Sequence, residues 1–145
     1  MATQLFYESV DIGTEITPLV KHPTTRQLVK WAGADGDYNE VHYDKDFAQK
    51  QGLSGVIVHG MLGVAFLGQM LTDWIGEEGT LRKLSCTYRG LFFPGQDAIC
   101  RGSITKKYVH DNEHCAECEI WLENPKGERV IRGTALVALP STSEG

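Results

Sequence analysis

Residues 59–75 form the longest apolar stretch of the chain, and the stretch is apolar on nearly every side of a helix. A helix that is hydrophobic all round is normally buried, so other elements must wrap it. Its polar residues fall in its last two turns, and Gly60, Gly63 and Gly68 offer small surfaces where other backbone can approach closely. We therefore predict a buried central helix that ends before Gly76.

The pattern changes after this helix, where apolar and polar residues alternate along residues 84–89, 98–109 and 114–123. A last strand presents one apolar face, which is formed by Ile131, Ala135, Val137 and Leu139. Turn-forming residues at 94–95 and 124–127 separate these strands. Long strands joined by short turns form an antiparallel sheet, and we expect its apolar face to enclose the central helix. The predicted fold class is α+β.

The residues before the central helix predict an edge strand and a shorter helix. Residues 16–21 alternate loosely, which is typical of an edge strand. Thr24 and Gln27 have the spacing of a capping box at the start of a helix that ends near Gly33 or Gly36.

The segment that joins this helix to the central one is polar. Residues 36–44 are dense in turn-forming residues and are predicted to be a loop without an element of its own. Asp44 caps a short helix that Gly52 stops, and residues 55–58 lead as an extended run into the central helix.

Composition and charge narrow the classes of function. A chain of 145 residues with 41% hydrophobic and 23% charged residues is typical of one globular domain, which we place over residues 1–145. The net charge is -5, and the pair Lys106 and Lys107 is the longest basic run, so nucleic acid and anionic membranes are not expected partners. The net charge does not exclude an anionic small ligand, because a pocket that binds one needs only a few local cations.

The chain has the features of a cytoplasmic protein. Its acidic start has no cationic region followed by an apolar core, so it is not a secretory signal. The apolar helix is shorter than the roughly 20 clean residues of a membrane span. All four cysteines lie in strand-like runs, where reduced cysteine acts as a small hydrophobe.

Asp37 and His42 are the first candidates for chemistry. A carboxylate and an imidazole that hold one water are a sensible acid and base pair near neutral pH, and Asn39 would orient either group. They face a common point only if their segment is a loop. The alternative is that Asp37 and Asn39 make ordinary turn hydrogen bonds and that His42 is an ordinary loop histidine.

The start of the central helix is the second candidate. The first amide groups of a helix lack intrahelical acceptors and carry partial positive charge, and Gly60 lets a ligand oxygen approach them. Such donors stabilise an enolate oxygen that develops on a thioester carbonyl. The alternative is that Gly60 serves close packing and that His59 caps the helix or packs.

A zinc site is a weaker candidate. His110, His114, Cys115 and Cys118 cluster in the sequence, but Cys115 and Cys118 point to opposite faces of a regular strand. We expect no metal.

The segments GDYNEVHYD at residues 36–44 and GVIVHGM at residues 55–61 resemble the two motifs of the MaoC-like family of (R)-specific enoyl-thioester hydratases and dehydratases. The resemblance covers essentially the whole domain in element order. It implies a hot dog fold, in which a strongly curved antiparallel sheet wraps one long helix. It also implies a homodimer, or a heterodimer with a related subunit, with active sites near the interface.

The resemblance also implies site residues. The catalytic aspartate of the family falls on Asp37, its catalytic histidine on His42, its supporting asparagine on Asn39 and its oxyanion glycine on Gly60. Glu40 stands where the family usually has proline, which removes a fixed φ beside the histidine.

The implied reaction is reversible hydration of a trans-2-enoyl thioester of coenzyme A or acyl carrier protein, with no cofactor. Two alternatives stay open. One is a hot dog thioesterase, although the only acid of the central helix, Asp73, lies at its far end. The other is an acyl-binding subunit that needs a partner chain.

Overall fold

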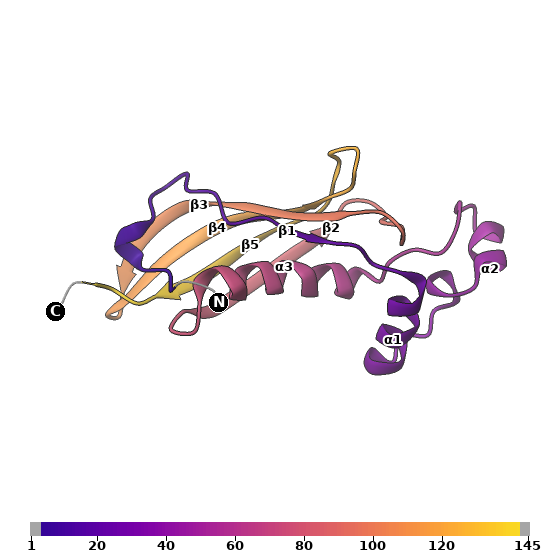
Figure 1. The fold of residues 1–145 in the computed structure, drawn as a ribbon, viewed down its shortest axis with the longest axis horizontal. Coiled ribbons are helices and arrows are strands. Elements are labelled where there is room, and N and C mark those ends of the chain that lie inside the picture. The colour runs from indigo at the N-terminus through magenta and orange to yellow at the C-terminus, as the bar shows by residue number, and fades with distance from the viewer. Residues whose placement is uncertain (1–3, 143–145) are drawn as a thin grey trace.

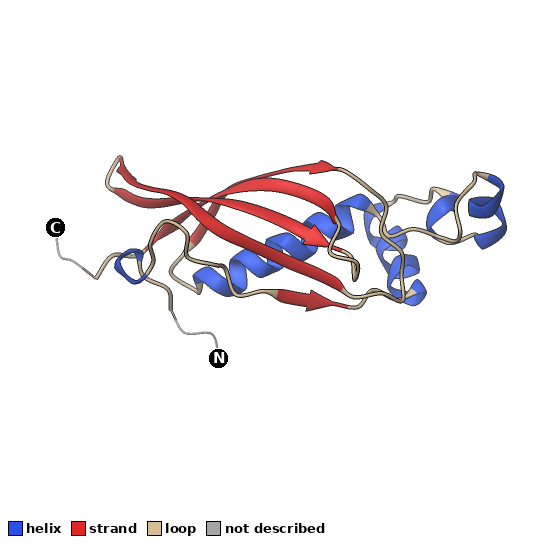
Figure 2. Ribbon diagram, turned by 90° about the horizontal axis from the view of Figure 1, so that it is seen from above, coloured by secondary structure: helices blue, strands red, loops and turns tan. Residues whose placement is uncertain are grey.

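The central helix α3 (Gly60–Ile75) lies along the concave face of one curved antiparallel sheet, as Figures 1 and 2 show for the computed structural model. The structure describes residues 4–142. The strands that form the sheet are β1 (Leu19–Lys21), β2 (Thr80–Tyr88), β3 (Ala98–His110), β4 (Glu113–Glu123) and β5 (Arg129–Leu139). The predictions of an α+β fold and of one helix wrapped by a curved sheet are confirmed.

The strand order is β1-β3-β4-β5-β2, so β1 and β2 are the two edges. All neighbours are antiparallel, and irregularities in pairing interrupt β3 near Thr105 and β2 near Arg82. Such bulges increase the local twist that a sheet needs to curve round a helix. The apolar face predicted for the last strand is confirmed, and the alternating apolar residues of β4 lie on the same inner face. The buried residues are Ala116, Cys118, Ile120, Leu122, Ile131, Ala135, Val137 and Leu139.

Helix α3 supplies the other half of the core. Eight of its residues are buried, and these are Leu62, Gly63, Phe66, Leu67, Met70, Leu71, Trp74 and Ile75. Gly63 shows how tightly the helix meets the sheet, because an added Cβ would lie 2.5 Å from Ile131 Cδ1. A side chain at position 63 is therefore excluded by β5, which explains a glycine inside a helix despite its cost of about 1 kcal/mol.

The predicted edge strand over residues 16–21 is wrong in its first half, because β1 covers only Leu19–Lys21. Pro18 has no N–H to give to a ladder, so regular pairing cannot extend through it. Ile16 is buried instead, and an added Cβ on Gly102 of β3 would lie 2.7 Å from its Cδ1. Ile16 therefore belongs to the core and packs beside Gly102 of β3.

Three short elements form an overhang beyond one end of the sheet (Figure 1): helix α1 (Thr25–Asp35), the 3-10 turn η2 (Glu40–His42) and helix α2 (Lys45–Lys50). The predicted cap of α1 is confirmed, since the Thr24 side chain accepts a hydrogen bond from Gln27 N–H. Gly36 ends α1 with a φ of 79°. A second 3-10 turn, η1 (Tyr7–Ser9), lies near the opposite end.

Among residues 4–142, no helix combines the length and the apolar character that a membrane crossing requires. The four cysteines are free thiols, of which Cys100, Cys115 and Cys118 are buried. Burial raises the pKa of the Cys100 and Cys118 thiols to about 12, so both are neutral hydrophobes at physiological pH.

Candidate active site

The loop after α1 carries both candidate proton-transfer groups. It was predicted to lack any element, but it contains the turn η2, because Asn39 caps it. The Asn39 side-chain oxygen accepts a hydrogen bond from Val41 N–H over 3.3 Å. The Asp37 carboxylate in turn accepts one from Asn39 N–H over 3.3 Å. These local bonds form the turn although Glu40 replaces proline, and they direct His42 inward.

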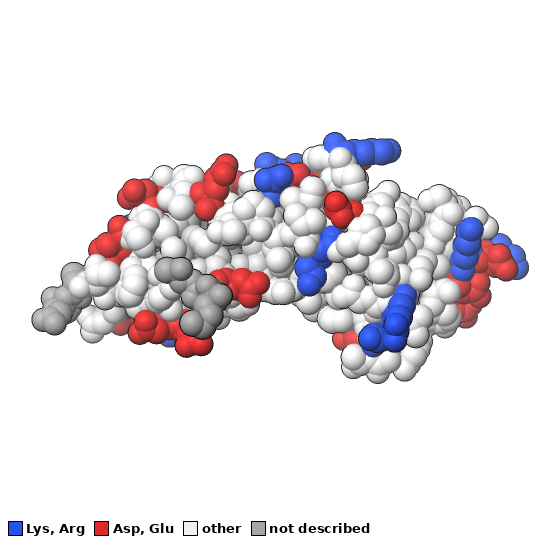
Figure 3. Space-filling model, viewed as in Figure 1, with Lys and Arg blue, Asp and Glu red and all other residues white. Residues whose placement is uncertain are grey.

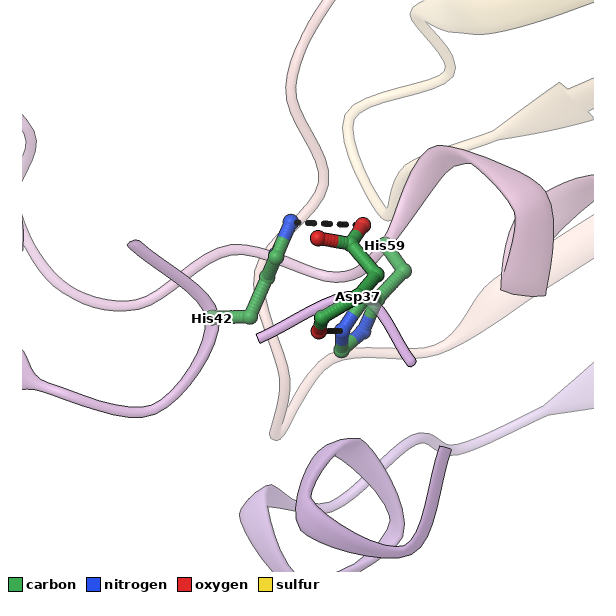
Figure 4. A group of neighbouring side chains, drawn as sticks. All are labelled: Asp37, His42 and His59. Carbon is green, nitrogen blue, oxygen red and sulfur yellow. Dashed lines mark hydrogen bonds and ion pairs between the residues drawn. The ribbon is translucent and has the colours of Figure 1, made fainter. Parts of the chain in front are cut away.

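Asp37 and His42 come together, as their loop allowed. His42 Nε2 lies 3.7 Å from an Asp37 carboxylate oxygen (Figure 4). This is too long for a direct hydrogen bond and leaves room for a shared ligand atom. The His42 side chain is 9% exposed and that of Asp37 43% exposed, so the pair has one buried side and one open side.

The tautomer of His42 follows from its other nitrogen. His42 Nδ1 lies 2.8 Å from the carbonyl oxygen of Ile57, which can only accept. Nδ1 therefore donates, and in the neutral ring Nε2 carries the lone pair that faces Asp37. Ile57 N–H also donates to the Val41 carbonyl, so Ile57 holds η2 by two hydrogen bonds.

His59 is the member of this cluster that the sequence motifs left without a role in chemistry. Its ring stacks on that of His42 with 3.8 Å between centroids, and its Nε2 lies 3.2 Å from the Asp37 carbonyl oxygen (Figure 4). It is 1% exposed and makes no side-chain cap of α3. Burial, and then the neighbouring His42, lower the pKa of His59, so the ring is neutral. Its position before the first residue of a buried helix is the signal that a sequence reader can use.

Gly60 is the first residue of α3, one residue after the start of the predicted helix, and the ring of Tyr88 lies against it. An added Cβ on Gly60 would lie 2.7 Å from Tyr88 Cζ. The first amide groups of a helix have no intrahelical acceptor, so the Gly60 N–H is available to a ligand beside this ring. The site therefore brings a carboxylate and an imidazole close to a helix start that offers a backbone donor.

An apolar cavity of about 260 Å³ opens beside these groups. His42, His59 and Gly60 lie at one end of it, and Phe66, Leu122 and Ile131 line its apolar walls. A wider groove of about 850 Å³ adjoins it and shares Gly90, Leu91 and Val130 with it. The groove also runs past Lys45 of α2 and Lys126 of the β4–β5 turn.

The charges of the chain are unevenly spread. On the face in Figure 3, Lys and Arg gather toward the end that carries α1, α2 and the β4–β5 turn, whereas Asp and Glu predominate toward the end with the termini. The site lies at the more basic end, so an anionic ligand is compatible with its surroundings despite the net charge of -5.

Asp37, His42 and His59 are also the only group of at least three metal-binding side chains that lie close enough to share an ion within residues 4–142, with ligand atoms within 4.8 Å of one another. The histidine rings are inclined by only 20°, so their lone pairs lie in nearly parallel, stacked planes and do not converge on one point. His59 Nε2 already faces a carbonyl oxygen. This arrangement suits a proton-transfer pair better than a metal.

Comparison with known proteins places the chain in a family. The MaoC-like domain family matches residues 9–122. A fatty acid synthase subunit beta of Gibberella zeae is 30% identical over 83% of the chain, which spans 6% of that subunit's length. A 3-oxo-4,17-pregnadiene-20-carboxyl-CoA hydratase beta subunit of Mycobacterium tuberculosis is 26% identical over 70% of the chain and 84% of its own length.

Among solved structures, an R-hydratase of Pseudomonas aeruginosa in its unliganded form has a TM-score of 0.86 at 21% identity, over 95% of the chain and 87% of its own. This likeness confirms the hot dog fold. Together with the match to residues 9–122, it shows that the chain belongs to the MaoC-like domain family.

Proposed function

We propose that this protein catalyses the reversible addition of water to trans-2-enoyl thioesters, which gives (R)-3-hydroxyacyl thioesters. The observation that carries the proposal is the 3.7 Å separation of His42 Nε2 and Asp37, where His42 lines an apolar cavity together with Gly60 at the start of α3. The related proteins named R-hydratase and CoA hydratase support the same reaction class, a hydro-lyase.

The Asp37 and His42 pair would hold the attacking water. The lone pair on His42 Nε2 accepts one hydrogen of the water, and the Asp37 carboxylate accepts the other. As the water oxygen bonds to C3 of the enoyl group, one of its protons passes to the pair, and the pair delivers one proton to C2. The water is thereby split into a hydroxyl on C3 and a hydrogen on C2, with no net change in the protein.

Gly60 would stabilise the intermediate. As oxygen attacks C3, the electron pair of the double bond moves toward the thioester carbonyl, which becomes an enolate oxygen. The Gly60 N–H at the positive end of α3 is a fixed donor for this charge. Because the protein's own groups stabilise the enolate, we propose that no cofactor takes part, in line with the sequence prediction.

The cavity and the groove suit the two parts of an acyl thioester. An acyl chain would fill the 260 Å³ cavity between α3 and the sheet, and the carrier arm would lie along the wider groove past Lys45 and Lys126. Coenzyme A and acyl carrier protein share a phosphate-bearing pantetheine arm, so both carriers fit the same proposal.

A second hot dog subunit is the partner that the surface favours. Within residues 4–142, no strand lies beside the outer edge of β2, and Met61, Tyr88 and Leu91 near it are about half exposed. An edge strand flanked by apolar side chains is suited to association with another chain. We propose that this surface joins a second copy or a related subunit, next to Gly60.

The test follows the loss of enoyl absorbance of crotonyl-CoA for the wild-type protein, Asp37→Asn and His42→Ala. We expect each variant to lower kcat by about 100-fold or more, since a positioned acid or base contributes 10²–10⁴-fold. Asp73→Asn, at the far end of α3, is the matched control and should keep wild-type rates. Equal rates in all four proteins would contradict the assignment.

The same preparations separate the two alternative functions. Release of free thiol from a saturated acyl thioester, without loss of enoyl absorbance from crotonyl-CoA, would identify a thioesterase instead. Tight binding without turnover, with activity recovered on adding a related subunit, would identify an acyl-binding chain.

A further inference from the structure

Two ring nitrogens behind the site are buried and have no hydrogen-bond partner among the described residues: Trp31 Nε1 and His59 Nδ1. A buried polar atom without a partner destabilises a fold, and such atoms are uncommon. These two are complementary. An indole N–H can only donate, and His59 Nδ1 is an acceptor in the neutral ring because Nε2 donates to the Asp37 carbonyl.

The two rings are neighbours. Their centroids are 6.5 Å apart and their planes are inclined by 56°. Trp31 stands on α1, whose last residues lead directly into Asp37, and His59 stands just before α3. With the rings this close, a side-chain rotation or one bridging water would join the two nitrogens.

We propose that Trp31 is a positioning residue, which donates its indole N–H to His59 Nδ1 and so completes a chain of hydrogen bonds from α1 to the Asp37 carbonyl. The indole cannot accept, so whichever ring nitrogen faces it must be the unprotonated one. The other nitrogen then carries the proton and donates to Asp37. Trp31 thereby fixes the tautomer of His59, and His59 holds the loop of Asp37 while its ring supports His42.

This series of hydrogen bonds explains why a buried histidine belongs at position 59. An apolar ring there would stack on His42 equally well but would leave the Asp37 carbonyl without its donor. Asn39 holds the Asp37 carboxylate from one side and His59 holds its backbone from the other. The catalytic consequence rests on the proposed function, whereas the hydrogen bonds do not.

Trp31→Phe tests the proposal because it keeps an aromatic ring and removes the N–H. Trp121→Phe is the matched control, since it removes an indole N–H that donates to Glu123 on β4, away from the site. We expect Trp31→Phe to lower kcat by about three- to tenfold with an unchanged KM, as loss of one positioning hydrogen bond implies. The control should keep both constants.

Nitrogen-15 NMR of the histidine rings decides the hydrogen bonds independently of activity. We expect wild-type His59 to be protonated on Nε2 alone, with Nδ1 accepting a hydrogen bond that is lost in Trp31→Phe and kept in Trp121→Phe. A wild-type spectrum with His59 protonated on Nδ1, or a Trp31 indole proton that exchanges as fast as an exposed one, would overturn the proposal. If these bonds are seen and no variant or wild-type protein hydrates crotonyl-CoA, only the proposed function fails.

Discussion

The imidazole rings of His42 and His59 lie face to face, 3.8 Å apart, and only His42 has a nitrogen directed at the Asp37 carboxylate. Two stacked imidazoles resist carrying positive charge together, and burial lowers the pKa of His59 further. His59 is therefore held neutral, and His42 is the ring to which the proposed reaction assigns proton transfer.

The stability of the fold should depend on pH through His59. Its pKa in the folded chain is below the ordinary value of 6.5. As the pH falls, the unfolded chain therefore takes up this proton before the folded chain does. The part of the free energy of unfolding that depends on neutral His59 is fully present above about pH 6.5 and is lost as the pH falls toward the folded pKa. We expect Tm to fall more steeply from about pH 7 to pH 5 in the wild type than in His59→Gln. Identical slopes in a thermal melt series would contradict this.

Gly60→Ala should separate the oxyanion donor from the acid and base pair. The added Cβ would meet the Tyr88 ring at 2.7 Å, so either the ring or the start of α3 must move. A displacement of about 1 Å near the reacting atoms can cost about 100-fold in rate, and we expect kcat to fall by about tenfold or more. Gly33→Ala is the control, since its Cβ would meet only Tyr38 Oη at 4.0 Å. An unchanged kcat in Gly60→Ala would argue against this glycine.

Gly63→Ala should destabilise the fold, and a second substitution should rescue it. The new Cβ would lie 2.5 Å from Ile131 Cδ1, and such overpacking costs about 1–3 kcal/mol, against about 1 kcal/mol gained by alanine in a helix. Ile131→Val removes the atom in conflict. We expect the double variant to be more stable than Gly63→Ala in urea unfolding, although Ile131→Val alone costs about 1 kcal/mol. Additive losses would mean that the contact is not the cause.

Tyr88→Asp should prevent association without unfolding the chain. Tyr88 is 52% exposed at the β2 edge, so a charge there reaches water in the single chain but would be buried against a partner. Val109→Asp is the control, because Val109 is 56% exposed on β3. We expect light scattering to show a smaller particle for Tyr88→Asp and the wild-type mass for Val109→Asp. An unchanged mass in both would place the interface elsewhere.

Much of the architecture was predictable, because hydrophobic patterns that extend over a whole helix or strand determine which face is buried. The all-round apolar helix required a wrapping sheet, and the alternation in β4 and the spacing of the apolar residues in β5 placed the inner face correctly. Boundaries were less predictable where one residue opposed the pattern. Pro18 shortened β1, and the Asn39 side chain made a turn from what read as plain loop.

The candidate site was predictable in its polar residues and not in its supports. Asp37, His42 and Gly60 were found through their motifs, and the structure brings them together, while their catalytic roles stay predictions. His59 and Trp31 were not found, because a buried histidine and a helix tryptophan look like ordinary core residues in a sequence. The inference about them depends on which buried nitrogens lack hydrogen-bond partners, and this can be seen only in the structure.

The run of residues 57–60 touches every group proposed for the reaction. Ile57 holds His42, His59 holds Asp37, and Gly60 supplies the amide donor. One short stretch of backbone therefore contacts all the groups of the proposed reaction. Residues 45–54 lie outside this stretch, but Lys45 and Ser54 line the wider groove. Under the proposed function, we expect a charge change at Lys45 to weaken binding of the carrier arm more than it lowers kcat, which would make this segment the place to change carrier specificity.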